Sequence, residues 1–264
     1  MYIMKTIPTI FAVVILLILA GCKEDHLEEK GFQVRPTAAD NEEDQANWIN
    51  QDSLKFDTRP SNVLLTGIQN IRLTTIYKVN FNKERKANFI GSNDYYGNYT
   101  DIANTSGNQW NNNFMPGIVA VYGYNMVNIS HYDINTNKQR NFFEKPVLIK
   151  TLYYPAYSKD TLNFKPVSRN YFMVSVYNND TNKDGFINIK DLRRFYLFNI
   201  NGDKQNALVP ENYSVLKSEY DPENDFMYVF AKLDENQNGQ QDESEPIHIY
   251  WVDLNDPTRL GRQF

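Results

Sequence analysis

Two twelve-residue segments place oxygen-bearing side chains at the same regular positions. The first, 180–191, reads DTNKDGFINIKD, and the second, 234–245, reads DENQNGQQDESE. Each has Asp or Asn at positions one, three and five, Gly at position six and a carboxylate at position twelve. A calcium ion takes six to eight oxygen ligands, and a loop with donors at positions one, three, five, seven, nine and twelve can surround it. Both segments are therefore predicted to bind Ca²⁺.

This spacing is that of the calcium-binding loop of an EF-hand. The predicted ligands of the first loop are the side chains of Asp180, Asn182, Asp184, Asn188 and Asp191 and the backbone carbonyl of Phe186. Those of the second loop are the side chains of Asp234, Asn236, Asn238, Asp242 and Glu245 and the carbonyl of Gln240. Each set holds three carboxylates, whose mutual repulsion a cation relieves.

Both loops depart from the usual EF-hand pattern in detail. Asp191 is shorter than the bidentate Glu expected at position twelve of the first loop. In the second loop, Asn238 replaces the Asp expected at position five, and Gln241 replaces the apolar residue expected at position eight. These differences predict modest calcium affinity rather than loss of binding.

The segments around the loops are typical of strands, whereas an EF-hand needs flanking helices. LRRFYLFNI follows the first loop, and FMYVFAKL and PIHIYWVDL flank the second; all are rich in aromatic and β-branched residues. The first loop also resembles half of a dockerin, a cohesin-binding module in which the loop opens a helix. A dockerin repeats its loop at a much shorter interval than the 54 residues that separate these two. We therefore expect two structural calcium ions, with a dockerin-like module as an alternative.

Four strand-like segments end in a similar phrase, which indicates a repeated unit. In each, an apolar-aromatic run meets Asp or Asn, followed by an apolar residue, Asn, a polar turn and a short final strand. The four segments are 77–90, 130–143, 196–209 and 250–264. A period near fifty residues with four short strands per unit is typical of a propeller blade. The 54-residue offset between the loops also superposes the last two phrases, so both loops are predicted to join the second and third strands of their blades.

The last unit carries a resemblance to a known family. SEYDPENDFMYVFA (218–231) resembles the strand-turn-strand phrase of TolB-like propeller repeats, and IYWVDLNDPTRLGR (249–262) is similar to the segment that comes next in those repeats. The resemblance extends from about residue 60 to the end, and it implies an all-β, β-propeller-like domain of about four units, each of four short antiparallel strands. In the last unit we expect strands at 213–220, 225–233, 246–254 and 258–264. A β-sandwich, or half of a larger ring completed by a partner, is an alternative.

The first 22 residues predict export and lipid attachment. The apolar run 10–20 is too short to span a bilayer as a helix but suits the hydrophobic region of a signal peptide. Leu19-Ala20-Gly21-Cys22 is similar to the lipobox of bacterial lipoproteins, and Cys22 is the only cysteine. The resemblance implies a signal helix over 1–21 that is removed, and acylation of Cys22 with palmitate or a similar chain. A disordered, acidic tether over 22–59 would then lead to the domain at 60–264.

The same region predicts a location. Lys23 follows the cysteine, so the Asp that retains some lipoproteins in the inner membrane is absent. KEDHLEE (23–29) resembles the acidic signals that send lipoproteins to the surface of some two-membrane bacteria. The implied location is the cell envelope, anchored by lipid to the outer membrane, with surface exposure as a further implication. A net charge of −5 without a basic cluster argues against a nucleic-acid partner.

The remaining motifs do not predict catalysis. The chain has three histidines, at 26, 131 and 248, and it lacks HExxH, GxSxG, P-loop and dinucleotide-binding sequences. We expect the two histidines in strand-like runs, His131 and His248, to be packing or surface residues. The predicted function is thus non-catalytic binding or scaffolding at the membrane surface, with a calcium-dependent hydrolase as an alternative.

One further segment has the composition of a sugar-binding surface. Residues 93–114 are rich in Asn and Gly, and aromatic faces beside amide donors suit sugar rings. The candidate ligand-binding residues are Tyr95, Tyr96, Tyr99, Trp110 and Phe114. A glycan-binding accessory lipoprotein is therefore another alternative, and the expected partner is an envelope protein or a glycan.

Overall fold

The fold is known from a computed structural model, which describes residues 31–34, 56–82, 86–90 and 115–264. All of the regular secondary structure in these ranges is β, which confirms that the described part of the chain is all-β. The seventeen strands found there are β1 (Phe32–Gln33), β2 (Thr58–Leu65), β3 (Ile71–Asn82), β4 (Ala87–Ile90), β5 (Ile118–Asp133), β6 (Lys138–Asn141), β7 (Leu148–Pro155), β8 (Asp160–Leu162), β9 (Lys165–Val167), β10 (Tyr171–Tyr177), β11 (Phe186–Ile187), β12 (Arg194–Asn199), β13 (Lys204–Ala207), β14 (Tyr213–Asp221), β15 (Phe226–Leu233), β16 (Ile247–Asp253) and β17 (Leu260–Arg262).

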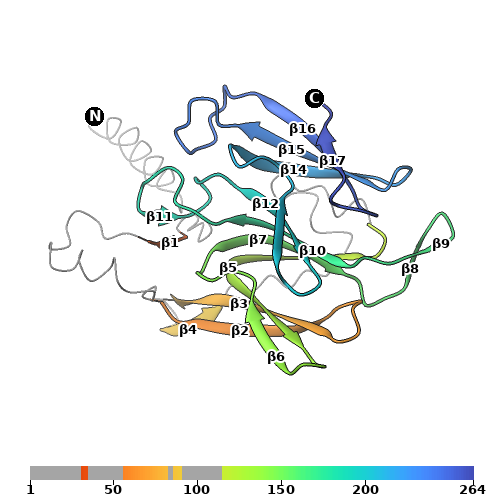
Figure 1. The fold of residues 1–264 in the computed structure, drawn as a ribbon. Helices are drawn as coiled ribbons and strands as arrows, with labels where there is room; N and C mark the ends of the chain where they lie inside the picture. The colour runs from red at the N-terminus through yellow and green to blue at the C-terminus, as the bar shows by residue number, and fades with distance from the viewer. Residues whose placement is uncertain (1–30, 35–55, 83–85, 91–114) are drawn as a thin grey trace, which may run out of the picture.

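Most of the strands form three antiparallel meanders of four (Figure 1). The first is β2-β3-β5-β6, the second β7-β10-β12-β13 and the third β14-β15-β16-β17. Pairing of β5 with β7 joins the first two into one sheet, and β4, which pairs with β3, completes its nine strands. The third meander is a separate sheet, and neither of the two sheets closes on itself within the described ranges.

Each of the four similar phrases contains a strand paired antiparallel with a short strand that follows it, as predicted. The hairpins are β3–β4, β5–β6, β12–β13 and β16–β17. The predicted strands of the last unit also match β14 to β17 closely. The expected count of four separate units is wrong for the described residues, because the first two phrases belong to one meander. The cause is β5, whose 16 residues are long enough to pair with β3, β6 and β7.

The two sheets pack face to face, with the C-terminal sheet over one face of the nine-stranded sheet (Figure 1). Strand β10 lies between two cores and is buried at every position. Successive side chains of a strand point to opposite faces of the sheet. Met173 therefore enters the core shared with the C-terminal sheet, where Met227 and Val229 lie. Phe172 and Val174 enter the other core, on the opposite face of the nine-stranded sheet. Burial on both faces explains why this strand is a continuous apolar run.

The N-terminal region differs in part from the expected flexible tether over 22–59. Residues Phe32–Gln33 form β1, which pairs with β11, and Phe32 is only 2% exposed. The expectation is therefore wrong for 31–34, because Phe32 has an apolar cluster to bury itself in. The predicted signal peptide, Cys22 and the tether segments 22–30 and 35–55 lie outside the described residues. The part of the chain that is described contains no helix with the length and apolar character that a membrane crossing requires.

Candidate metal centre

Both predicted calcium loops connect the second and third strands of a meander. The loop 180–191 lies between β10 and β12, with the short β11 inside it, and the loop 234–245 lies between β15 and β16. Both project from the same end of the molecule, at the left of Figure 1. Strand β12 begins three residues after Asp191, where the dockerin alternative requires a helix. The strand context of both loops agrees with the prediction.

Backbone N–H groups of the first loop hold its side-chain oxygens on the inner side of the turn. Asp180 Oδ2 accepts the N–H of Gly185 at 3.1 Å, which joins positions one and six. Asn182 Oδ1 accepts the N–H of Asp184 at 3.0 Å, and Asp184 Oδ1 accepts that of Phe186 at 2.9 Å. The bonds accepted by Asn182 and Asp184 are Asx turns, in which a side-chain oxygen binds the backbone two residues on. The ligand positions one, three and five are thereby fixed in orientation.

The second loop repeats this pattern position by position. Asp234 Oδ2 accepts the N–H of Gly239 at 3.1 Å, Asn236 Oδ1 that of Asn238 at 2.9 Å, and Asn238 Oδ1 that of Gln240 at 2.8 Å. Positive φ angles also occur at the same positions. At position four they are 61° and 58°, and at position six 90° and 76°. The two loops thus share one backbone conformation, although their sequences agree mainly at the ligand positions.

The carboxylate at position twelve closes each loop in the same way. Asp191 accepts the N–H of Thr181 at 2.7 Å and that of Asn188 at 2.9 Å. Glu245 accepts the N–H of Glu235 at 3.1 Å and that of Asp242 at 2.9 Å. In both loops this carboxylate therefore bridges positions two and nine.

The Asp191 side chain is 0% exposed, and this burial makes its carboxylate harder to ionise. Removal from water raises the pKa of this group, while the backbone hydrogen bonds from Asn188, Thr181 and Asn182 act in the opposite direction. A buried carboxylate that is costly to ionise is a group that a bound cation would stabilise.

The donor sets fit a hard cation such as Ca²⁺. In the second loop, the amide nitrogens of Asn236 and Asn238 both donate to Asp242 Oδ2 at 2.7 Å, so positions three, five and nine converge. The predicted ligands are carboxylate, amide and backbone oxygens, which calcium prefers. Within the described ranges no three His, Cys, Asp or Glu side chains gather into a metal-binding group. Each predicted donor set combines three carboxylates with two Asn side chains and one backbone carbonyl.

The two loops touch each other, which the sequence did not predict. Thr181 Oγ1 donates to the carbonyl of Gly239 at 2.6 Å and accepts the N–H of Leu192 at 2.8 Å. A Cβ added to Gly239 would lie 2.0 Å from the carbonyl oxygen of Thr181. The two backbones therefore approach each other at a point where only glycine fits. Position two of the first loop and position six of the second form a direct bridge between the two sheets.

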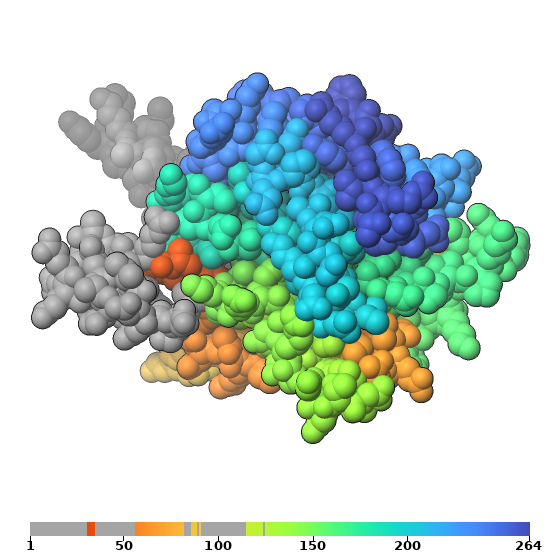
Figure 2. Space-filling model, in the orientation of Figure 1, coloured from red at the N-terminus to blue at the C-terminus, as the bar shows by residue number. Residues whose placement is uncertain are grey.

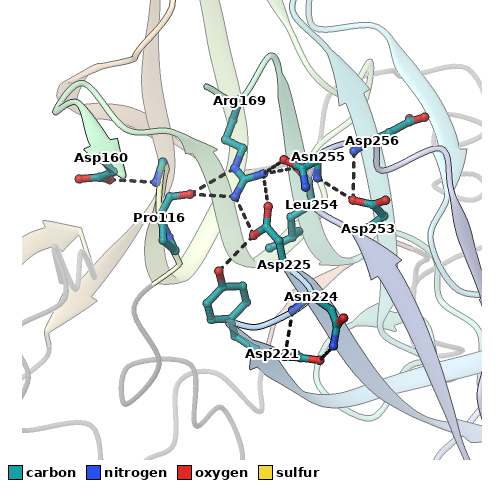
Figure 3. A network of polar contacts seen from close by, with 12 residues as sticks. Pro116, Asp160, Arg169, Asp221, Asn224, Asp225, Asp253, Leu254, Asn255 and Asp256 are labelled. Atoms are coloured by element: carbon teal, nitrogen blue, oxygen red, sulfur yellow. Dashed lines mark hydrogen bonds and ion pairs between the residues drawn. The ribbon is translucent and has the colours of Figure 1, made fainter. Parts of the chain in front are cut away.

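A buried ion pair connects the sheets at the opposite ends of β10 and β15 (Figure 3). Arg169, just before β10, donates to both carboxylate oxygens of Asp225, just before β15, at 2.8 and 2.9 Å. The guanidinium also donates to the carbonyls of Pro116 and Leu254, and Tyr220 donates its hydroxyl to Asp225. This network is saturated by the protein itself, so it fixes the sheets and offers no group to a ligand.

The remaining predicted residues divide into two groups. His131 donates a hydrogen bond from Nε2 to the carbonyl of Ile200 at 2.8 Å, and its ring packs near Phe142. His248 pairs with the hydroxyl of Tyr213 at 2.7 Å, so both strand histidines have the packing roles that were predicted. Cys22 and the candidate sugar-binding residues Tyr95, Tyr96, Tyr99, Trp110 and Phe114 lie outside the described residues.

Comparison of the sequence with protein-family models and with curated proteins found no match. The feature of the chain that bears most directly on function is the pair of loops, which share spacing, backbone conformation and hydrogen bonds, and which lie against each other.

Proposed function

We propose that this protein is a lipid-anchored envelope protein whose all-β domain is stabilised by two calcium ions and serves in non-catalytic binding or scaffolding. The observation that supports this most strongly is the matched conformation of the loops 180–191 and 234–245, each closed by a carboxylate at position twelve. The predicted lipid on Cys22 would place the domain at a membrane, and we propose the outer membrane.

Calcium would act here as a clamp on strand connections. A twelve-residue polar connection is costly to order, and a bound cation supplies the charge that holds its oxygens together. In the first loop the ion would be held by Asp180, Asn182, Asp184, Asn188, Asp191 and the Phe186 carbonyl; in the second, by Asp234, Asn236, Asn238, Asp242, Glu245 and the Gln240 carbonyl. Because the loops touch, the ions would also brace the contact between the two sheets.

A non-catalytic role is supported by the way the reactive groups are used. His131 and His248 take part in packing contacts, and the buried Arg169–Asp225 pair is enclosed by its own hydrogen bonds. The glycan-binding alternative depends on 93–114, and no observation on the described residues favours it or the hydrolase alternative.

Calcium should raise the melting temperature of the full mature chain after EDTA treatment. At free calcium one hundredfold above the dissociation constant, linkage gives about 2.7 kcal/mol of stabilisation per site. Differential scanning calorimetry measures the shift, and isothermal titration calorimetry should show two sites with Ca²⁺ and weaker or no binding with Mg²⁺, which demands a stricter octahedral geometry. Absence of both binding heat and thermal shift would contradict the proposal.

Variants at position one of each loop test whether the ions occupy these loops. Asp180→Asn and Asp234→Asn keep the shape of the side chain but remove one ligand charge, so each should weaken one site by about tenfold or more, equivalent to about 1.4 kcal/mol. Asp221→Asn is the matched control, since Asp221 also accepts backbone N–H groups in a turn but lies outside both loops. Equal calcium affinity in all three variants would place the ions elsewhere.

The membrane anchor gives a separate expected result. Cells of a two-membrane bacterium that express the full chain with labelled palmitate should incorporate label into this protein, whereas the Cys22→Ser variant should incorporate none. Cys22 is the only cysteine, so the variant removes the only thiol that could carry the lipid. Fractionation then locates the protein, and label on the Ser variant would refute acylation at this residue.

A further inference from the structure

A short segment of the predicted tether lies against the outer edge of the first calcium loop (Figure 2). Strand β1 pairs antiparallel with β11, with Phe32 opposite Ile187 and Gln33 opposite Phe186. The N–H of Val34 donates to the carbonyl of Gly185 at 2.8 Å. The segment 31–34 therefore contacts positions six, seven and eight of the loop.

The pairing with β1 uses only the outer edge of β11, so the backbone groups on the inner edge are available to an ion. In an antiparallel ladder, residues alternate between pairs that exchange hydrogen bonds across the strands and pairs that do not. Gly185 faces β1 through its bond from Val34, so Phe186, the next residue, directs its backbone groups to the other edge. Its N–H indeed donates to Asp184 Oδ1 at 2.9 Å, on the inner side of the loop. The same short strand can thus bind β1 on one edge and present the Phe186 carbonyl to calcium on the other.

The pairing is accompanied by a buried side chain. Phe32 is 2% exposed in a cluster with Val127, Leu148, Tyr177 and Ile187. The affinity of such a site comes from strand addition through the backbone together with a pocket for one anchoring side chain.

Gly31 is required for this approach. Its φ is +49°, and a Cβ at this position would lie 1.7 Å from the carbonyl oxygen of Ile187. Lys78 Nζ donates to the Gly31 carbonyl at 3.1 Å and so fixes the segment from the side of β3. The loop edge therefore selects an extended segment that begins with glycine followed by a large apolar residue.

We propose that the outer edge of the first calcium loop is a docking site for the segment 31–34, and that calcium controls its occupancy. This inference rests on the proposed calcium binding. A two-stranded pairing of two residues each is marginal by itself, and its partner β11 is part of the loop that the ion orders. An ion bound on the inner edge fixes β11, and a fixed β11 can retain β1.

The consequence is control over the distance between the lipid anchor and the domain. Eight residues separate Cys22 from Gly31, and the nine Cα-to-Cα steps reach at most roughly 30 Å when the segment is fully extended. If the segment leaves the loop, the first strand residue of the domain is Thr58, and the 36 Cα-to-Cα steps from Cys22 to Thr58 reach at most roughly 120 Å. Calcium would then hold the domain near the membrane, and its removal would extend the range over which the domain can meet a partner.

Hydrogen–deuterium exchange on the full mature chain tests the proposal. Calcium should slow exchange of the Val34 amide at least tenfold relative to EDTA, together with the amides of both loops. The hairpin β8–β9 is the internal control, because it is also an isolated pair of short strands but contacts neither loop, and its exchange should not change. Phe32→Ala and Gly31→Val should abolish the protection of Val34, whereas Phe164→Ala, which removes a fully exposed phenylalanine, should leave it intact.

The outcomes separate this inference from the proposed function. If calcium binds and protects both loops while exchange of 31–34 stays the same with and without the ion, the docking proposal fails and the calcium proposal stands. If titration calorimetry detects no calcium binding, both fail. Thermodynamic linkage adds a second requirement. If calcium strengthens the docking of 31–34 by some factor, then docking of 31–34 must strengthen calcium binding by the same factor. Gly31→Val should therefore weaken the first site by that factor, and an unchanged affinity beside a large change in exchange would overturn the coupling.

Discussion

Replacement of Arg169 by alanine should lower the free energy of unfolding by about 3–5 kcal/mol, the usual cost of removing one partner of a buried ion pair. The change leaves the Asp225 carboxylate buried without its counter-charge, and it leaves the Pro116 and Leu254 carbonyls without their donor. Chemical denaturation in the presence of calcium measures the loss, provided that the slope of the transition is unchanged. Asp225→Asn, which keeps the shape but removes the charge, should also be strongly destabilising.

The matched control is the exposed ion pair between Arg140 and Asp203. Its N–O distance is 2.5 Å, but the two side chains are 49% and 45% exposed, so solvent screens the attraction. Arg140→Ala should cost less than about 1 kcal/mol. If Arg169→Ala proves no more harmful than Arg140→Ala, the network in Figure 3 does not hold the sheets together.

The importance of this ion pair follows from its place in the fold. Strands β10 and β15 lie in the facing sheets, and both contribute to the core between them. The Arg169–Asp225 pair connects the sheets just before these strands begin, and the Thr181–Gly239 contact connects them just after the strands end. Apolar packing is not directional, so two polar connections at opposite ends determine how one sheet is placed on the other.

The local parts of this fold could be predicted from the sequence because their causes are local. The repeated Asp or Asn caps a hairpin turn: Asp133, Asn199 and Asp253 each accept, at 2.9 Å, the N–H of the residue two positions on. Because the side chain binds backbone only two residues away, this turn can be predicted from a short stretch of sequence. Asn80 looks the same in sequence, but its oxygen accepts the amide of Asn125 at 3.0 Å, so similar letters do not always have the same role.

The long-range parts could not be predicted for the opposite reason. Arg169 and Asp225 are 56 residues apart, and Thr181 and Gly239 are 58 apart; nothing in the residues between them specifies that they meet. Strand β1 is two residues long, too short to show the alternation that identifies a strand. The candidate calcium loops could be predicted because all their proposed ligand positions lie within twelve residues, whereas their contact depends on how two sheets pack.

Gly239→Ala should weaken calcium binding at both loops, although the residue belongs to only one of them. The residue has φ +76°, which strains any other side chain, and its Cβ would collide with the Thr181 carbonyl. Thr181 must then move, and its N–H and hydroxyl are the groups that position Asp191 and Leu192 in the first loop. The backbone strain alone should cost about 1–3 kcal/mol, and with the collision we expect the free energy of unfolding to fall by about 2 kcal/mol or more. The calcium affinity of each site should fall at least tenfold.

Gly202→Ala separates this coupling from simple backbone strain. Gly202 has the same φ of +76°, but its Cβ would meet side-chain atoms of Phe142 and His131 at 3.1 and 3.3 Å, outside either loop. It should lose stability without losing calcium affinity. Thr181→Val then removes the hydroxyl bond to Gly239 without a collision, and titration calorimetry should again show both sites weakened. If Gly239→Ala weakens the second site and leaves the first unchanged, the loops bind their ions independently and their contact only packs the sheets.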